Sequence, residues 1–325
     1  MIKIGVIGTG SMGRNHVRNI CELPGYYEFV GFHDVKEENI RFIEDTYGIA
    51  HFDNVDRLIG SVDALVVAAP SFLHFELGSK IIRQGKHALI EKPITLVETE
   101  GKILCEKFAV QNKVLMVGHV ERFNPAVTEM KKVIDQEGGV IALDAKRCGP
   151  FNPRISDTNV VFDLMIHDLD IIINYLYPHP VRTVDAKAVK VMSENNCDYA
   201  QAIMQFDTGI ITTLLASKVT EDKIRTIDVH TRQSLIRADL LNKTLSITRK
   251  TKLLNLHNYT PVYSQETIIE KVILPNVEPL KCELVEFANA INQNRQGLTD
   301  GGSAVNALHY AELINKLCQQ EYKDV

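Results

Sequence analysis

Residues 2–13 read IKIGVIGTGSMG, and this stretch decides the fold. The apolar run Ile2–Ile7 predicts a buried strand, and a helical pattern continues to about Ile20. Between them stands G-x-G-x-x-G, in which Gly8 permits a tight turn, Gly10 lets the backbone approach a pyrophosphate, and Gly13 allows close helix–strand packing. The helix N-terminus then offers free N–H groups to phosphates. The predicted cofactor contacts here are Gly8, Gly10, Ser11, Met12 and Gly13.

An acidic residue follows the second predicted strand, Phe29–His33. Asp34 stands 21 positions beyond Gly13, where a carboxylate accepts hydrogen bonds from ribose hydroxyls and repels a 2′-phosphate. The sequence therefore favours NAD over NADP, although the nearby Lys36 softens that discrimination. The alternative is that Asp34 only caps the next helix, predicted at Glu37–Tyr47.

Strand and helix patterns alternate through the first 120 residues. Continuous apolar runs at Ala64–Ala69, Ala88–Ile90 and Val114–Val117 are typical of strands covered on both faces. A helix is predicted at Thr99–Gln111. Such alternation indicates an α/β fold of the Rossmann type, with a doubly wound parallel sheet.

The pattern changes after Asn124-Pro125, which begins a helix to about Asp135. The predicted elements that follow are a strand at Val140–Arg147, a long apolar helix at Val160–Tyr177, strands from Val184 to Leu274, and helices at Pro279–Asn294 and Gly302–Gln319. We expect an α+β domain with a largely antiparallel open sheet. The predicted division is an NAD-binding domain at 1–122 and a second domain at 123–325.

Composition agrees with two domains, because 325 residues exceed the roughly 250 that one core usually serves. A net charge of -5 argues against nucleic acid as a partner. No apolar run approaches the roughly 20 residues of a membrane helix, and the chain opens on a strand without a leader pattern. Six scattered cysteines form no C-x-x-C pair, so we expect a cytoplasmic protein without disulfides or structural zinc.

A lysine follows the strand Ala88–Ile90, in Glu91-Lys92-Pro93. Ligands of open α/β sheets bind beyond the carboxyl ends of the strands, and Pro93 restrains Lys92 to an extended conformation. Lys92 there can take a proton from a substrate hydroxyl. Taken alone, it can equally be a surface lysine.

Two polar residues interrupt the apolar helix of the second domain. Asp163 and His167 have i, i+4 spacing and share a face. His167 can accept a hydroxyl proton, while Asp163 orients the substrate or the imidazole. The alternative is a hydrogen-bonded pair in the core. A metal site would need a third ligand that the sequence does not offer, so no metal is expected.

Together these motifs resemble the Gfo/Idh/MocA family of nicotinamide-dependent sugar oxidoreductases. The resemblance rests on GTGSMG (8–13), AAPSFLH (68–74), EKP (91–93), GHVERFNP (118–125) and DLMIHDLD (163–170). It implies NAD as cofactor, and Lys92, Asp163 and His167 as catalytic residues. It also implies that residues 123–325 form the substrate-binding and oligomerisation domain of a homodimer or homotetramer. It also implies that Pro70, His74 and Glu91 lie near the nicotinamide end of the cofactor.

A narrower similarity is to the branch that oxidises the 3-hydroxyl of UDP-N-acetylglucosamine, carried by GHVERFNP and by the segment 146–170. For this branch Arg154, Arg147 and Arg122 are candidate partners of a diphosphate. The alternative is that they are solvated loop charges. Asn159 stands where a glycine is expected in this branch. If the loop around Asn159 approaches the sugar, the identity of the substrate stays open.

The function expected from this resemblance is hydride transfer from a sugar carbon to NAD, with Lys92 as the proton-handling residue and His167 as its partner or the alternative base. Three alternatives stay open. They are a dehydrogenase of a free cyclitol or monosaccharide, a glycosidase that retains NAD, and a non-catalytic NAD-binding regulatory protein.

Overall fold

The computed structural model describes residues 1–151, 159–192, 196–250 and 267–320. The chain forms two compact units. Unit 1 comprises residues 1–123 and 277–309, and unit 2 comprises residues 124–276 and 310–325.

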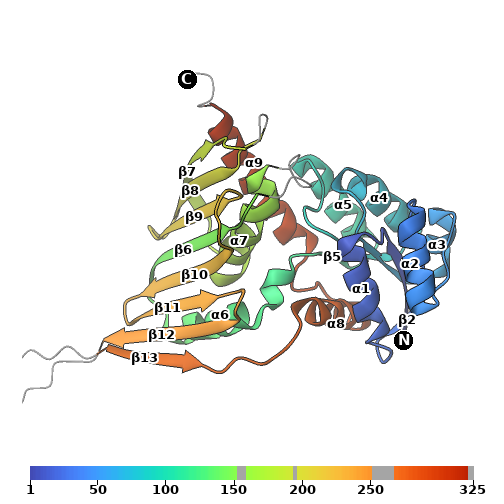
Figure 1. Cartoon of the computed structure of the whole chain (residues 1–325), viewed down its shortest axis with the longest axis horizontal. Helices are drawn as coiled ribbons and strands as arrows, with labels where there is room; N and C mark the ends of the chain where they lie inside the picture. The colour runs from blue at the N-terminus through green and yellow to red at the C-terminus, as the bar shows by residue number, and fades with distance from the viewer. Residues whose placement is uncertain (152–158, 193–195, 251–266, 321–325) are drawn as a thin grey trace, which may run out of the picture. The chain divides into compact units, whose positions relative to one another are not determined.

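Unit 1 is built on a parallel sheet of five strands in the order β2-β1-β3-β4-β5 (Figure 1). The strands are β1 (Ile2–Ile7), β2 (Tyr27–His33), β3 (Ala64–Val67), β4 (His87–Ile90) and β5 (Leu115–Val117). The central residues of β1, β3, β4 and β5 are buried, as in a sheet covered on both faces, while the edge strand β2 is only partly buried at its centre. The strand order reverses between β1 and β3, which makes their carboxyl ends the expected place for a ligand.

Helices connect these strands. They are α1 (Ser11–Cys21), α2 (Glu37–Tyr47), α3 (Val55–Ser61), α4 (His74–Arg83) and α5 (Glu98–Val110). As predicted, α2 ends at Gly48, which adopts a left-handed φ of 65°. The sequence patterns missed α3 and α4. The expected parallel α/β architecture is confirmed.

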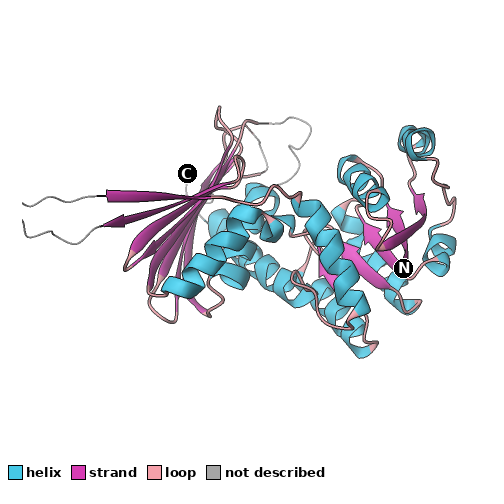
Figure 2. Ribbon diagram, turned by 90° about the horizontal axis from the view of Figure 1, so that it is seen from below, coloured by secondary structure: helices cyan, strands magenta, loops and turns pink. Residues whose placement is uncertain are grey.

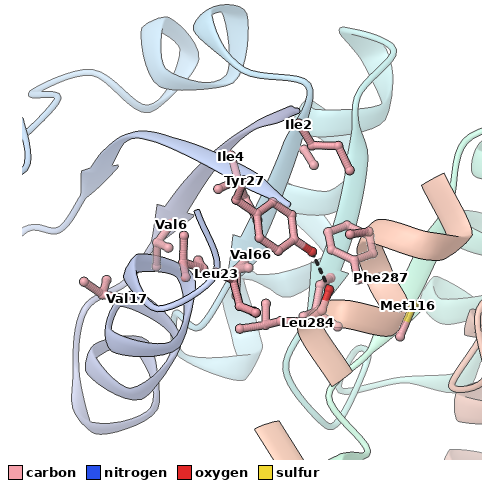
Figure 3. Close-up of a cluster of buried hydrophobic side chains, with 14 of the residues drawn as sticks. Ile2, Ile4, Val6, Val17, Leu23, Tyr27, Val66, Met116, Leu284 and Phe287 are labelled. Atoms are coloured by element: carbon pink, nitrogen blue, oxygen red, sulfur yellow. Dashed lines mark hydrogen bonds between the residues drawn. The ribbon is translucent and has the colours of Figure 1, made fainter. Parts of the chain in front are cut away.

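The first core also contains a helix from late in the chain (Figure 3). Leu284 and Phe287 of α8 (Pro279–Asn292) are fully buried in the same cluster as Ile4 and Tyr27. The Tyr27 hydroxyl donates a hydrogen bond of 2.5 Å to the carbonyl of Leu284. The division expected at 122/123 assigned α8 to the second domain, whereas the structure includes Val277–His309 in unit 1. The sheet of unit 1 packs against the apolar face of α8.

Unit 2 is built on a sheet of eight strands in the order β13-β12-β11-β10-β6-β9-β8-β7. The strands are β6 (Val140–Cys148), β7 (Val181–Val189), β8 (Tyr199–Phe206), β9 (Ile211–Ser217), β10 (Ile224–Thr231), β11 (Ser234–Asp239), β12 (Thr244–Lys250) and β13 (Thr267–Val272). All neighbours pair antiparallel except β6 and β9. The expected antiparallel-rich sheet is confirmed.

Helices of unit 2 lie against one face of this sheet (Figure 2). They include α6 (Pro125–Glu137), whose cap Asn124 accepts a hydrogen bond from the Ala126 N–H. The predicted helix at Val160–Tyr177 is a short α7 (Ile166–Ile171) between two π-helical segments, Val161–Met165 and Ile172–Leu176. The last helix, α9 (Gly301–Gln320), runs from unit 1 into unit 2.

Candidate functional site

The glycine turn after β1 has the geometry that a pyrophosphate requires. Gly8 has a φ of 86°, and a Cβ there would lie 2.7 Å from the Ala68 carbonyl oxygen. A Cβ on Gly13 would lie 2.0 Å from the carbonyl oxygen of Gly8, so α1 packs against the turn with no room for a side chain. A Cβ on Gly10 would meet nothing within 4 Å. Gly10 therefore leaves the open space beside the helix N-terminus that a phosphate group needs.

Asp34 follows β2 and is held by the same turn. Its Oδ2 accepts hydrogen bonds from the N–H and hydroxyl of Thr9, at 2.6 and 2.9 Å, and from Asn39 at 3.1 Å. Its Oδ1 accepts the Lys36 N–H at 2.8 Å. Burial opposes ionisation, but these hydrogen bonds outweigh it and lower the pKa of Asp34 below its ordinary value. The carboxylate is thus kept ionised, and Oδ1 retains acceptor capacity for a ribose hydroxyl.

The alternative role for Asp34 was to cap α2. The N-cap residue of that helix is Lys36, without a side-chain cap, so the alternative was wrong. Asp34 instead joins the glycine turn to the segment that precedes the helix.

A pocket of about 400 Å³ opens at the carboxyl ends of β1, β2 and β3. Its walls include Gly8, Gly10, Asp34, Lys36, Asn39 and Pro70. The apolar side chains of Val35, Val55, Leu73 and Leu77 line the rest, which suits the flat face of an adenine. The residues of this turn and pocket therefore fit a dinucleotide.

A partly buried hydrogen bond between Glu91 and His16 supports the lysine at the end of β4. Oε1 of Glu91 lies 2.7 Å from Nε2 of His16 in α1, and Oε2 accepts the backbone N–H of Lys92 at 3.3 Å. Burial opposes the charge, but His16 and Lys92 outweigh it and lower the pKa of Glu91. His16 was not predicted as a functional residue from the sequence. The signal was present, because His16 stands on the buried face of α1 with Gly13, Val17 and Ile20.

His74 lies beside the same segment but is buried, with 1% of its surface exposed. Its Nδ1 lies 2.8 Å from the Pro93 carbonyl oxygen and its Nε2 lies 2.9 Å from that of Ala69. Burial lowers its pKa, against the opposing effect of these carbonyl groups. The ring therefore connects the segment after β3, which carries Pro70, to the segment after β4, which carries Lys92.

Asp163 and His167 lie in unit 2, and Lys92 lies in unit 1. Asp163 is in the first π-helical segment, and its Oδ2 lies 3.1 Å from Nζ of Lys218. His167 is partly buried in α7. Lys218 follows β9 and was missed by the sequence analysis, since a single lysine after a strand carries no pattern.

The arginines predicted to bind a diphosphate have different surroundings. Arg147 on β6 is 2% exposed and binds Asp168 through Nε at 3.0 Å and Nη2 at 2.7 Å. Arg122, in unit 1, is equally buried and donates to the Leu298 carbonyl at 2.6 Å. Neither is a solvated loop charge, and Arg154 lies outside the described residues.

Asn159, the departure from the resembled branch, has a structural role. Its side-chain oxygen accepts the Val161 N–H at 2.8 Å, and its amide donates to Asn315 at 2.8 Å. Asn159 thereby links the start of the π-helical segment Val161–Met165 to α9.

Within the described ranges, no group of three or more His, Cys, Asp or Glu side chains is arranged to hold a metal ion. Among the helices described, none has both the length and the apolar character required to cross a membrane.

Comparison with known proteins decides the family. Residues 2–119 match the model of the oxidoreductase family with an NAD-binding Rossmann fold, and residues 143–236 match the GFO/IDH/MocA C-terminal domain. The chain is 31% identical over 301 residues to UDP-N-acetylglucosamine 3-dehydrogenase of Acidithiobacillus ferrooxidans, covering 92% of each chain. The chain belongs to the Gfo/Idh/MocA family. It is therefore an NAD-binding oxidoreductase, and NAD is its cofactor.

Other known proteins are also similar to this chain in sequence or in fold. Glucose-6-phosphate 3-dehydrogenase of Bacillus subtilis is 28% identical over 244 residues, which cover 67% of this chain and 68% of the relative. The solved structure of the Acidithiobacillus ferrooxidans enzyme has a TM-score of 0.89 at 29% identity, with 98% of both chains covered. A scyllo-inositol dehydrogenase from Lactobacillus casei has a TM-score of 0.81 at 18% identity, covering 99% of this chain and 98% of that one, and thus shares the fold.

Proposed function

We propose that this protein oxidises the 3-hydroxyl of UDP-N-acetylglucosamine to the 3-keto sugar with NAD as hydride acceptor. The observation that carries the proposal is the match to UDP-N-acetylglucosamine 3-dehydrogenase along 92% of both chains. The residues around the glycine turn support it, because they fit the cofactor that such a reaction needs.

NAD supplies the hydride-accepting chemistry when it is bound. The glycine turn and the N-terminus of α1 hold its pyrophosphate, with Ser11 and Met12 beside it. Asp34 binds the adenosine ribose and keeps out a 2′-phosphate. Pro70, His74 and Glu91 support the nicotinamide end, with His74 acting through the segments that it braces.

Lys92 takes the proton from the sugar hydroxyl. Glu91 holds the backbone at this point and is itself held by His16. His167 is the partner of Lys92 or the alternative base, and Asp163, held by Lys218, orients the sugar. Alignment of the hydroxyl with these groups supplies much of the rate. In this scheme unit 1 serves the cofactor and unit 2 the substrate.

The test is NAD reduction with UDP-N-acetylglucosamine, in the presence of a carbonyl trap because a 3-keto product accumulates poorly. We expect reduction with this substrate and little with free N-acetylglucosamine, myo-inositol or glucose 6-phosphate. No reduction with UDP-N-acetylglucosamine, but reduction with one of the others, would move the assignment to a free-sugar dehydrogenase. Binding of NAD without reduction across the panel would favour a regulatory protein.

We further propose a cytoplasmic homodimer or homotetramer. Three apolar side chains, Ile203, Ile211 and Ile224, are 38–51% exposed and alternate with the residues that the helices of unit 2 bury. A second copy packed on this open face of the sheet, as the resemblance to the family implies, would cover these side chains. Light scattering on the purified protein tests this, and a monomeric mass would overturn it.

A further inference from the structure

A small pocket in unit 2 is lined by an excess of positive charge. It has a volume of about 140 Å³, and its lining residues include the end of β6, the start of β10 and the residue that follows β9. Four cationic side chains line it, namely Arg147, Lys218, Lys223 and Arg225, together with one carboxylate, Asp163.

Strand register brings these cations together. Arg225 on β10 is directly opposite Arg147 on β6, and Lys218 follows Ser217, the partner of Cys148 on β6. Opposed residues of an antiparallel pair point to the same face, and like charges in such positions destabilise the sheet. Concentrating four cations here is therefore unfavourable for the fold alone.

Two of these cations, Arg147 and Lys218, have carboxylate partners. Asp168 binds Arg147 in a bidentate pair, and Asp163 binds Lys218. The residues that line the pocket carry four positive charges and one negative charge. Lys223 is exposed, and no carboxylate in the described part of the chain forms an ion pair with it.

We propose that this pocket binds the diphosphate of the nucleotide-sugar substrate, through Lys223, Arg225 and Lys218. The inference rests on the proposed function and assigns the phosphate-binding residues of that substrate. A diphosphate has negative charge to match the pocket, and guanidinium groups bind phosphate oxygens in bidentate fashion. The volume is below the roughly 300–1,000 Å³ of pockets for whole small-molecule ligands, as expected for one part of a nucleotide sugar.

The roles of the cations differ. Arg147 is committed to Asp168 and lies deepest, so it is a positioning residue that shapes the floor of the pocket. Lys218 carries both the phosphate contact and the contact to Asp163, and thereby links phosphate binding to the residue proposed to orient the sugar. Lys223 and Arg225 are the more accessible contacts.

The experiment measures binding of UDP and of inorganic pyrophosphate by calorimetry, and the KM for UDP-N-acetylglucosamine, with Lys223→Ala and Arg225→Ala. The matched control is Lys146→Ala, an exposed lysine on β6 next to Arg147. Each pocket variant should weaken UDP and pyrophosphate binding about 10- to 100-fold, as expected for losing a hydrogen bond to a charged group. Lys146→Ala should bind both as the wild type does, and NAD binding should be unchanged in all three variants, which also shows that they are folded.

Two failures are distinguishable. If the wild type oxidises UDP-N-acetylglucosamine and both pocket variants keep its affinity for UDP and pyrophosphate, the pocket assignment is wrong and the proposed function stands. If the wild type does not act on UDP-N-acetylglucosamine and binds neither probe, both are wrong. Partial recovery of UDP binding in Lys223→Arg would support the assignment, because the variant restores the charge.

Discussion

Nε2 of His16 lies 2.7 Å from Oε1 of Glu91, so a side chain of α1 holds the residue that precedes Lys92. The glycine turn and the lysine that we propose for proton transfer are thereby mechanically linked within unit 1. The helix whose N-terminus we propose to bind the pyrophosphate also holds the backbone at Lys92, through His16 and Glu91.

This pair predicts a pH dependence of stability. Because the folded state lowers the pKa of Glu91, its charge stabilises the fold above the ordinary pKa of a glutamate, about 4.3, and this stabilisation is lost as pH falls through the lowered pKa. Glu91→Gln should therefore reduce the free energy of unfolding by about 1 kcal/mol at pH 7, and the difference should shrink in acid. Urea unfolding over a pH series tests this, with Glu28→Gln on the exposed side of β2 as control. A difference that does not change with pH would contradict it.

Lys92→Ala should lower turnover by about 10²–10⁴, the usual contribution of a general base. Steady-state NAD reduction measures the loss, and calorimetry should show that NAD still binds. Lys3→Ala, at an exposed position of β1, is the matched control. A folded Lys92→Ala enzyme with normal turnover would remove Lys92 from the mechanism.

Asp34→Asn should shift cofactor preference. The substitution removes the charge that repels a 2′-phosphate and weakens the bonds from Thr9 and Lys36. We expect kcat/KM for NAD to fall about tenfold. The ratio of kcat/KM for NAD to kcat/KM for NADP should fall further than this. Glu38→Gln, at an exposed position of α2, is the control. An unchanged ratio would show that Asp34 serves only the turn.

Arg147→Ala should act chiefly on stability. Removing one partner of a buried ion pair leaves the other charge uncompensated, at a cost of about 3–5 kcal/mol. Urea unfolding measures this, and Arg147→Met with Asp168→Leu should recover part of the loss. A stable Arg147→Ala protein with weakened UDP binding would instead make Arg147 a direct phosphate contact.

Local sequence signals located much of the fold and the glycine turn that we propose for the cofactor. The G-x-G-x-x-G turn, Asp34 and the apolar runs of β1, β3 and β4 each depend on neighbouring residues, so the sequence expresses them directly. The partner of α8 was not predictable, because an amphipathic helix shows which face it buries but not against what. For the same reason Leu284 and Phe287 gave no sign that they join the core around Tyr27.

Pairings between residues far apart in the sequence were also not predictable. Arg147 with Asp168, Asp163 with Lys218, and His16 with Glu91 each join separate elements, and charge type alone does not select among many candidate partners. The small pocket of unit 2 was not predicted for this reason. Lys223 and Arg225 lie near Arg147 because of the way in which β10 pairs with β6. The π-helical segments around α7 likewise share the apolar pattern of an ordinary helix.

The most direct test of hydride transfer from the sugar is the reaction of UDP-N-acetylglucosamine carrying deuterium at C3, with NAD and a carbonyl trap, followed by mass spectrometry of the reduced nicotinamide. We predict that the deuterium appears in the reduced cofactor and that the trapped product is the 3-keto sugar. Reduced cofactor without deuterium, or no reduction while glucose 6-phosphate or inositol is oxidised, would contradict the proposed function.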